Sequence, residues 1–323
     1  MSELPWLVAD VGGTNARFGL VTAPGEAPSQ VAVLAGAEYA SLPDAVAAYL
    51  ADHAGGVRPG AACVAVAGPI GGDAYELTNL PWAGSISALG LPYATLLNDF
   101  EALAVSLPHL AGNDLVWLGG PPPCDGIKAV LGPGTGLGVA GLVPGDQGWI
   151  PVPGEGGHVS VPVYDEREQE IVSALRAQGL RHVEAEHVLS GPGLTRLHRA
   201  LALVNGVAGA ETLTASEIVA REDDPLCAET IEVFCAMLGT FAGNVALTLG
   251  ARGGVYIGGG VLPRIVERVR ASAFRRRFEA SPSMSGYLST IATALITAPQ
   301  PALTGAAAWL TQQLSRRSVY EPA

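Results

Sequence analysis

The apolar residues of this chain gather in short runs that are separated by turns rich in glycine. A short continuous or alternating apolar run is typical of a strand, whereas apolar residues repeated about every three to four positions are typical of a helix. The pattern predicts strands at residues 6–9, 16–21, 31–39, 62–67, 94–97, 127–131, 139–143 and 290–296, with a further apolar run at 255–257. It predicts helices at residues 42–53, 100–107, 166–177, 192–204, 215–221, 228–249 and 302–314. Strands interleaved with helices predict an α/β fold.

The order of these elements restarts halfway along the chain. A strand, a glycine turn at residues 12–15 and a second strand open the sequence, and the same series recurs around a glycine turn at residues 132–138. A third glycine turn follows at residues 153–158. With 323 residues, the chain is long enough for two domains or one large one, and the restart favours two similar halves.

One long charge-free stretch, residues 233–251, has to be weighed as a membrane span. Its apolar residues recur at helical spacing, and Thr240, Asn244 and several glycines interrupt it, so a buried helix fits better. Its Gly239-x-x-x-Gly243 pattern predicts close packing against another element. We therefore expect no membrane partner.

Composition and charge narrow the classes of function. Hydrophobic residues make up 49% of the chain and charged residues 15%, which is typical of a globular protein. The net charge of −12 argues against a nucleic-acid partner, and the one basic run, residues 275–277, is expected to be a solvated helix end. Lys128 is the only lysine, and no G-x-x-x-x-G-K-[ST] loop surrounds it, which excludes a P-loop nucleotide site.

The cysteines and the first residues bear on location. The cysteines form no C-x-x-C pair and have no histidine at metal-ligand spacing. They are predicted to be buried free thiols in a reducing compartment, and hence in a cytoplasmic protein: Cys63, Cys124, Cys227 and Cys235. The first residues lack the basic and apolar regions of a secretory signal, which agrees with that expectation.

The first glycine turn has the residues of a phosphate site. Gly12 and Gly13 have no Cβ atoms, so backbone N–H groups can approach phosphate oxygens closely. Thr14 and Asn15 add side-chain donors. Asp10, just before the turn, is expected near a phosphate-bound Mg²⁺, most simply through water. A simple hairpin turn is the alternative interpretation.

The second glycine turn weakens that alternative. It carries Gly134, Thr135 and Gly136 at a place that matches the first turn. Two glycine–threonine turns at matching places in two halves suggest one phosphate chain held from both sides.

Two further polar pairs are candidates for ligand binding. Asn98 and Asp99 follow one predicted strand and precede a helix, at a strand end where open α/β sheets bind ligands. A helix N-cap is the alternative interpretation of this pair. Glu155 and His158 lie in the third glycine turn, where such side chains are often only solvated.

Six segments together resemble the bacterial glucokinase family, which belongs to the hexokinase relatives of the actin-like ATPase superfamily. They occur in the family's order and span nearly the whole chain: residues 9–17, 98–100, 134–138, 153–158, 189–194 and 253–260. The cysteine-rich zinc motif of the repressor/open-reading-frame/kinase sugar kinases is absent, which indicates the zinc-free branch. Pro133 departs from the small residue expected in the second turn, but its fixed φ suits a turn.

The resemblance implies two actin-like ATPase domains, related to ribonuclease H, each with a mixed five-stranded sheet. It places the active site in the cleft between them. The small domain would comprise residues 1–110, completed by a C-terminal helix at 302–316, and the large domain residues 111–301.

The resemblance also implies an enzyme that transfers a phosphoryl group from ATP, with Mg²⁺, to the 6-hydroxyl of glucose, giving glucose 6-phosphate. Asp99 would accept the proton of that hydroxyl. The implied sugar ligands are Asn98, Asp99, Glu155, His158 and a later glutamate, for which Glu186 fits best and Glu184 is the rival. Gly258 and Gly259 would lie against the adenosine.

Two other functions stay open. One is a kinase for another hexose, such as mannose or fructose. The other is a sugar-sensing regulator without catalysis; such regulators usually carry a basic helix-turn-helix, and none precedes residue 6. The sequence does not decide between ATP and polyphosphate as donor. It is compatible with a homodimer and leaves the oligomeric state open.

Overall fold

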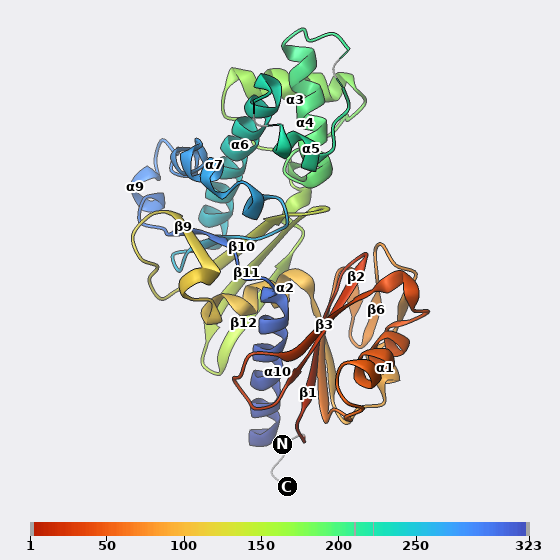
Figure 1. The fold of residues 1–323 in the computed structure, drawn as a ribbon. Coiled ribbons are helices and arrows are strands. Elements are labelled where there is room, and N and C mark those ends of the chain that lie inside the picture. The colour runs from red at the N-terminus through yellow and green to blue at the C-terminus, as the bar shows by residue number, and fades with distance from the viewer. Residues whose placement is uncertain (1–2, 210, 222, 321–323) are drawn as a thin grey trace. The chain divides into compact units, whose positions relative to one another are not determined.

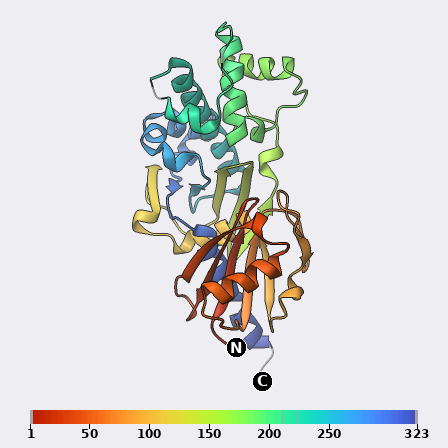
Figure 2. The same cartoon turned by 45° about the vertical axis from the view of Figure 1, so that its right-hand side comes forward.

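The computed structural model describes residues 3–209, 211–221 and 223–320 and divides into two compact units (Figures 1 and 2). Unit 1 consists of the described residues of Met1–Ala111, Leu142–Pro153 and Ala298–Ala323. Unit 2 consists of those of Gly112–Gly141 and Gly154–Thr297.

This division differs from the predicted domain boundaries at residues 142–153. They belong to the hairpin of β11 (Leu137–Gly145) and β12 (Gly148–Gly154). The Trp149 N–H donates to Gln312 Oε1 at 2.9 Å, and Gln312 Nε2 donates to the Trp149 carbonyl at 2.8 Å. These bonds attach the hairpin tip to helix α10 (Pro301–Tyr320), a pairing across 163 residues that no local pattern records. Two separate functional domains remain a prediction.

Unit 1 is built on a five-stranded mixed sheet in the order β3-β2-β1-β4-β8. β1 is antiparallel to β2 and parallel to β4, which in turn is parallel to β8. The strands are β1 (Trp6–Val11), β2 (Asn15–Val21), β3 (Ser29–Ala35), β4 (Ala61–Val66) and β8 (Ala94–Asn98). β3 ends before its predicted end at residue 39, because residues 36–38 form a 3-10 turn.

Helices cover both faces of this sheet, so its strands are apolar on both sides. Trp6 and Val8 of β1 pack with α10, whereas the intervening Leu7 and Ala9 pack with α1 (Leu42–Asp52). Figure 1 shows α1 and α10 on opposite sides of the sheet. α2 (Asp99–Ser106) lies beside α10 at the close approach of Gly305, where a Cβ would lie 1.7 Å from the Ala102 carbonyl oxygen.

A small antiparallel sheet beside the first was not predicted. Its strands, β5 (Ile70–Gly71), β6 (Ala74–Glu76) and β7 (Ala83–Ser85), are too short for an apolar alternation to be visible in the sequence. Trp82 next to it is buried, and its indole N–H donates to the Tyr39 carbonyl at 3.0 Å.

The second sheet has six strands in the order β12-β11-β10-β13-β14-β9. Its first five positions repeat the strand order of the first sheet. The family resemblance implied five strands. The sixth is β9 (Leu115–Gly119), which pairs antiparallel with β14 (Thr293–Ile296) at the edge of the sheet. β9 escaped prediction because it is only partly buried, with Trp117 43% exposed. The central strands are β10 (Lys128–Pro133) and β13 (Val255–Ile257).

The helices of unit 2 pack around one long apolar helix, α6 (Pro225–Leu249). The predicted close packing at Gly239 and Gly243 is confirmed: Cβ atoms there would lie 2.2 and 2.6 Å from the carbonyl oxygens of Phe274 and Phe278. α6 is long and apolar enough to cross a membrane, but 72% of its most apolar window is buried inside the protein, as in a core helix. The other helices are α3 (Glu166–Ala177), α4 (Gly191–Val204), α5 (Ala215–Ala220), α7 (Val266–Ala271), α8 (Phe274–Phe278) and α9 (Ser285–Leu288).

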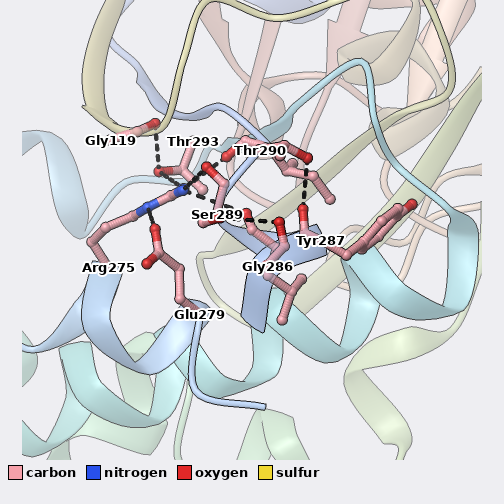
Figure 3. Close-up of polar contacts among 10 residues, drawn as sticks. Gly119, Arg275, Glu279, Gly286, Tyr287, Ser289, Thr290 and Thr293 are labelled. Atoms are coloured by element: carbon pink, nitrogen blue, oxygen red, sulfur yellow. Dashed lines mark hydrogen bonds and ion pairs between the residues drawn. The ribbon is translucent and has the colours of Figure 1, made fainter. Parts of the chain in front are cut away.

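The expectation of a solvated basic run at residues 275–277 is wrong for two of its three arginines. Arg275 Nε donates to Glu279 Oε1 at 2.6 Å, and its Nη1 donates to the Ile291 carbonyl and to Thr293 Oγ1 (Figure 3). Arg277 is buried and donates to the buried Glu168 at 2.5 Å. Both arginines have partners in distant segments, so a run of like charges alone could not reveal their burial.

Three of the four cysteines are buried, as predicted: Cys63, Cys227 and Cys235. Cys124 is exposed instead, since it lies in a loop. Its thiol donates to the Arg252 carbonyl at 3.1 Å. All four are free thiols.

Candidate functional site

In unit 1, the parallel strands bring the predicted residues to one edge of the sheet. β1, β4 and β8 pair in register at Val11, Val66 and Asn98, so all three strands end at the same level. The first glycine turn follows β1, and Asp99 follows β8. Two segments more than eighty residues apart in sequence therefore share one sheet edge.

The two glycines of the first turn differ in the space around them. Gly12 donates its N–H to the Asn15 carbonyl at 3.0 Å, and a Cβ on Gly12 would meet only that oxygen, at 3.6 Å. A Cβ on Gly13 would lie 2.5 Å from the Cβ of Asn79, so a side chain is excluded there. The Thr14 side chain is exposed and free to reach a ligand.

Asp10 sits just before this turn as a largely buried carboxylate, 18% exposed. Arg17 lies directly opposite in the β1–β2 pair, and its Nη1 donates to Asp10 Oδ2 at 3.2 Å. Burial raises the pKa of the Asp10 carboxyl, and the Arg17 charge opposes that rise. Arg17 had no role among the residues predicted from the sequence. The register of a hairpin closed by residues 12–14 was the signal that could have paired Arg17 with Asp10.

Asn98 and Asp99 begin α2, and the N-cap interpretation is correct for Asn98. Its Oδ1 accepts the Phe100 N–H at 2.9 Å, while Glu101 Oε2 accepts the Asn98 N–H at 3.0 Å. Asp99 is the first residue of the helix, and its Oδ1 also accepts from the Phe100 N–H, at 2.9 Å. The cap fixes the backbone that carries the Asp99 carboxylate.

The pKa of Asp99 is raised to about 6. Burial is the main cause, and the neighbouring Asp10 charge adds to it, whereas the hydrogen bond from Phe100 N–H lowers the pKa. A carboxylate with this pKa is ionised at neutral pH and takes a proton readily, which suits a general base.

In unit 2, the second glycine turn and the glycines after β13 also lie at one sheet edge. β10 and β13 are parallel, with Leu131 opposite Ile257. Gly134 N–H donates to the Gly136 carbonyl at 2.8 Å and closes the turn.

The glycines after β13 lie against this turn. Gly259 has a φ of +91°, and a Cβ there would lie 2.1 Å from the Pro133 carbonyl oxygen. Thr135 at the tip is exposed, and Gly258 N–H donates back to Leu131 O at 2.8 Å.

Glu186 is fastened to this turn. Its Oε2 accepts the Leu137 N–H at 2.8 Å, and a Cβ on Gly136 would lie 2.4 Å from the same oxygen. The Glu186 carboxylate therefore lies directly against the second glycine turn, and Gly136 is the residue that makes room for it.

His158 and Glu155 occupy the third glycine turn, where residues 156–158 form a 3-10 turn. His158 Nδ1 lies 2.8 Å from Glu184 Oε2, and its Nε2 lies 4.0 Å from Glu155 Oε2. The Glu155 side chain is 92% exposed and that of His158 54%. The segment that carries Glu184 is held alongside by Ala185 N–H, which donates to the Val159 carbonyl at 2.8 Å.

These carboxylates shift the titration of the histidine. The hydrogen bond to Glu184 is the largest cause of a raised His158 pKa, and the charges of Glu186 and Glu155 add to it. The same hydrogen bond lowers the pKa of Glu184. Both shifts favour the charged pair, at a position open to solvent.

Each unit thus gathers its own predicted residues. Unit 1 holds Asp10, Gly12, Gly13, Thr14, Asn15, Asn98 and Asp99. Unit 2 holds Gly134, Thr135, Gly136, Glu155, His158, Glu186, Gly258 and Gly259, together with the rival Glu184. Within the part of the chain that the structure describes, no group of three or more His, Cys, Asp or Glu residues could hold a metal ion.

Comparisons with known proteins agree on one family. A family model described as Glucokinase matches residues 7–313. The chain is 46% identical to a glucokinase of Saccharophagus degradans over 97% of this chain and 100% of that protein. It is 49% identical to a glucokinase of Paramagnetospirillum magneticum over 94% of this chain and 97% of that protein. Longer relatives named bifunctional protein glk are matched over 50% of their length.

A solved structure is similar over nearly the same span. The crystal structure of a glucokinase from an Antarctic psychrotroph superposes with a TM-score of 0.87 at 38% identity. The match covers 95% of this chain and 98% of that one.

Proposed function

The chain belongs to the glucokinase family and phosphorylates glucose at the expense of ATP, and we propose that Asp99 is the base of this transfer. Asp99 accepts the proton of the sugar's 6-hydroxyl as that oxygen attacks the γ-phosphorus, and glucose 6-phosphate and ADP are the products. The observation that carries the proposal is the position of Asp99: a capped helix start, at a sheet edge, with a pKa raised to about 6.

The chemistry asks little more of a base than correct placement. Phosphoryl transfer depends mainly on aligning the two substrates and stabilising charge, and a positioned base contributes about 10²–10⁴-fold to the rate. The cap formed by Asn98 and Glu101 fixes the start of α2 and thereby limits where the Asp99 carboxylate can lie.

The residues that we propose as sugar ligands form two groups, one in each unit. In unit 1, the side-chain oxygen of Asn98 caps α2, which leaves its amide nitrogen to donate to a sugar hydroxyl. Asp99 accepts from the reacting hydroxyl. In unit 2, Glu155 and His158 present exposed polar atoms, and Glu186 contributes the carboxylate oxygen that does not accept the Leu137 N–H. Carboxylates and imidazole nitrogens pair well with the vicinal hydroxyls of a hexose.

The phosphates are held by the two glycine turns. Residues 13–15 supply backbone N–H groups and the exposed Thr14 hydroxyl, and residues 135–136 supply the same types of group. The N–H groups of Gly12 and Gly134 donate within their turns and close them. Gly258 and Gly259 lie beside the second turn, and we propose that the adenosine end of the nucleotide lies against their backbone.

Asp10 fits a Mg²⁺ that keeps most of its water shell. It is a single, largely buried carboxylate beside a glycine turn, and the described residues contain no cage of protein ligands. Bound together with ATP, Mg²⁺ would supply charge neutralisation on the phosphates. Arg17 supplies a fixed positive charge beside the same carboxylate.

We also propose that the two sheets belong to two domains of the actin-like ATPase fold. The repeated strand order, with one glycine turn after β1 and the other after β10 at the matching position of the second sheet, supports this assignment. A homodimer and a cytoplasmic location remain predictions.

A coupled assay tests the proposed function. The purified protein is mixed with ATP, Mg²⁺ and, in parallel, glucose, mannose or fructose, and sugar phosphate formation is followed; a further arm replaces ATP with polyphosphate. The proposal expects glucose 6-phosphate with ATP in the wild type and its near loss in Asp99→Asn. Preferred turnover of another hexose would correct the substrate, and binding of glucose without turnover would indicate a sensor.

A further inference from the structure

Glu184 makes the shorter of the two carboxylate contacts to His158, although it stands outside the set of sugar ligands proposed above. Its Oε2 lies 2.8 Å from His158 Nδ1, which is hydrogen-bond distance. Glu155 Oε2 is 4.0 Å from the other ring nitrogen, Nε2, which is too far for a hydrogen bond.

The backbone around Glu184 is anchored on both sides. The Glu184 N–H donates to His187 Nδ1 at 3.1 Å, and Glu184 forms an isolated antiparallel bridge with Ser160, two residues after His158. Its side chain is 28% exposed, half the value of His158. The carboxylate is therefore a fixed point for a ring that otherwise extends into solvent.

The chemistry of the contact defines which nitrogen carries the proton. An ionised carboxylate has no hydrogen to donate, so Nδ1 must be the donor in this pair. In the neutral ring, Nε2 is then unprotonated and can accept a hydrogen bond. The lowered pKa of Glu184 keeps that carboxylate ionised through the neutral range.

We propose that Glu184 is a positioning residue of the sugar site, which holds the His158 Nδ1–H and so presents Nε2 to a hydroxyl group of the hexose. The inference rests on the proposed role of His158 as a sugar ligand. It assigns different tasks to the two rival glutamates: Glu184 orients His158, and Glu186 lies on the second glycine turn.

Substituting Glu184 should change sugar binding and leave the chemical step alone. In Glu184→Ala the ring loses its fixed partner, and we expect the KM for glucose to rise about tenfold with kcat and the KM for ATP within about twofold. In Glu184→Gln a neutral hydrogen-bond partner remains, so the rise in the glucose KM should be smaller.

The state of the His158 ring gives a readout that loss of packing would not produce. Ring ¹⁵N shifts of the full-length protein, followed against pH without ligands, report both the tautomer and the pKa of His158. The wild type should show the Nδ1–H tautomer and a pKa above 6.5. Glu184→Ala should shift the neutral ring toward Nε2–H, and both variants should lower the pKa because the neighbouring charge is gone.

His182→Ala is the matched control. His182 Nε2 lies 3.5 Å from Ser160 Oγ in the same pair of segments, so its removal disturbs the neighbourhood without touching the contact. It should leave the His158 tautomer, the His158 pKa and the glucose KM unchanged.

Two results would overturn the inference. If the His158 ring behaves alike in wild type and Glu184→Ala, Glu184 does not position it. If the ring is unchanged in Glu184→Ala and the KM for glucose still rises, Glu184 contacts the sugar itself. Absence of glucose turnover in the wild type would instead overturn the proposed function, and the ring measurement, made without substrate, keeps the two failures apart.

Discussion

The two units carry acidic sites of opposite character. In unit 1, Asp10 and Asp99 are largely enclosed, and burial raises the pKa of both carboxyls. In unit 2, Glu155, Glu184 and Glu186 surround an exposed histidine, and the pKa of Glu184 is lowered by its hydrogen bond to that ring. Burial makes a carboxylate ready to take a proton, whereas exposure beside a cation makes it a stable hydrogen-bond acceptor.

The glycine turns of the two units differ in a similar way. In the first turn, glycine makes room for a neutral amide side chain, since a Cβ on Gly13 would meet Asn79. In the second turn, it makes room for a charge, since a Cβ on Gly136 would meet the Glu186 carboxylate. Under the proposed function, the same strand order would support a proton-accepting site in one unit and a hydroxyl-recognising site in the other.

The largest expected effect separates the two sites at the chemical step. Asp99→Asn keeps the shape of the side chain and cannot take a proton, so kcat should fall by about 10²–10⁴-fold while glucose still binds. Steady-state kinetics and glucose titration would check this. Near-normal turnover would leave Asp99 as part of a helix cap only.

Substitutions in unit 2 should act on sugar binding instead. His158→Ala should raise the KM for glucose by roughly 5- to 150-fold, because a sugar hydroxyl left unpaired costs roughly 1–3 kcal/mol. Glu155→Gln keeps a neutral hydrogen-bond partner and should raise the same KM less. The KM for ATP should change far less. If the KM for ATP changes and the KM for glucose does not, the third glycine turn would be part of the nucleotide site.

A smaller effect is expected where a Cβ enters the first glycine turn. In Gly12→Ala the new atom has space within the protein, so the fold should persist, but the KM for ATP should rise about tenfold, or ~1.4 kcal/mol. Gly71→Ala, where a Cβ meets nothing within 4 Å, is the control and should leave both melting temperature and KM unchanged. An unchanged ATP KM in Gly12→Ala would remove this turn from the phosphate site.

The last expected effect concerns the stability of the protein rather than its kinetics. A carboxyl whose folded pKa is raised from 3.8 to about 6 is costly to ionise, so Asp99 destabilises the protein above pH 6 and has no such cost below pH 4. Asp99→Asn should therefore be more stable at pH 7 by about 1–2 kcal/mol. This gain is less than the full value of a pKa shift of about two units, because Asp99 is only partly buried. Urea titrations at pH 7 and pH 4 should show a gain that vanishes in acid; an equal gain at both would exclude this origin.

Most of the elements predicted from the sequence are those in which apolar residues recur at a regular spacing. The central strands of both sheets and helices α1, α3, α4 and α6 were predicted because their apolar spacing extends over enough residues. The strands β5 to β7 and the helices α8 and α9 are too short to show a period. Helix α7 was also missed, although α5, of the same length, was predicted. The burial of Arg277 depends on Glu168, more than a hundred residues away, so no local pattern could indicate it.

For the candidate site, the sequence predicted the groups but not their partners. Glycine turns and polar pairs at strand ends were visible, and parallel pairing brings them to one edge in each unit. Which glutamate touches His158 depends on the bridge between Ser160 and Glu184, a tertiary contact. The Asp10–Arg17 pair depends on hairpin register, which the turn length fixes but the motif alone does not state.

The pH dependence of kcat/KM for glucose tests the division of labour most directly. The base must be deprotonated, so activity of the wild type should fall as the pH drops through about 6, the raised pKa of Asp99. The account predicts that His158→Ala keeps this acid limb, at a lower overall level, and that the residual activity of Asp99→Asn lacks it. An acid limb that persists in Asp99→Asn and disappears in His158→Ala would contradict the account and make His158 the proton acceptor.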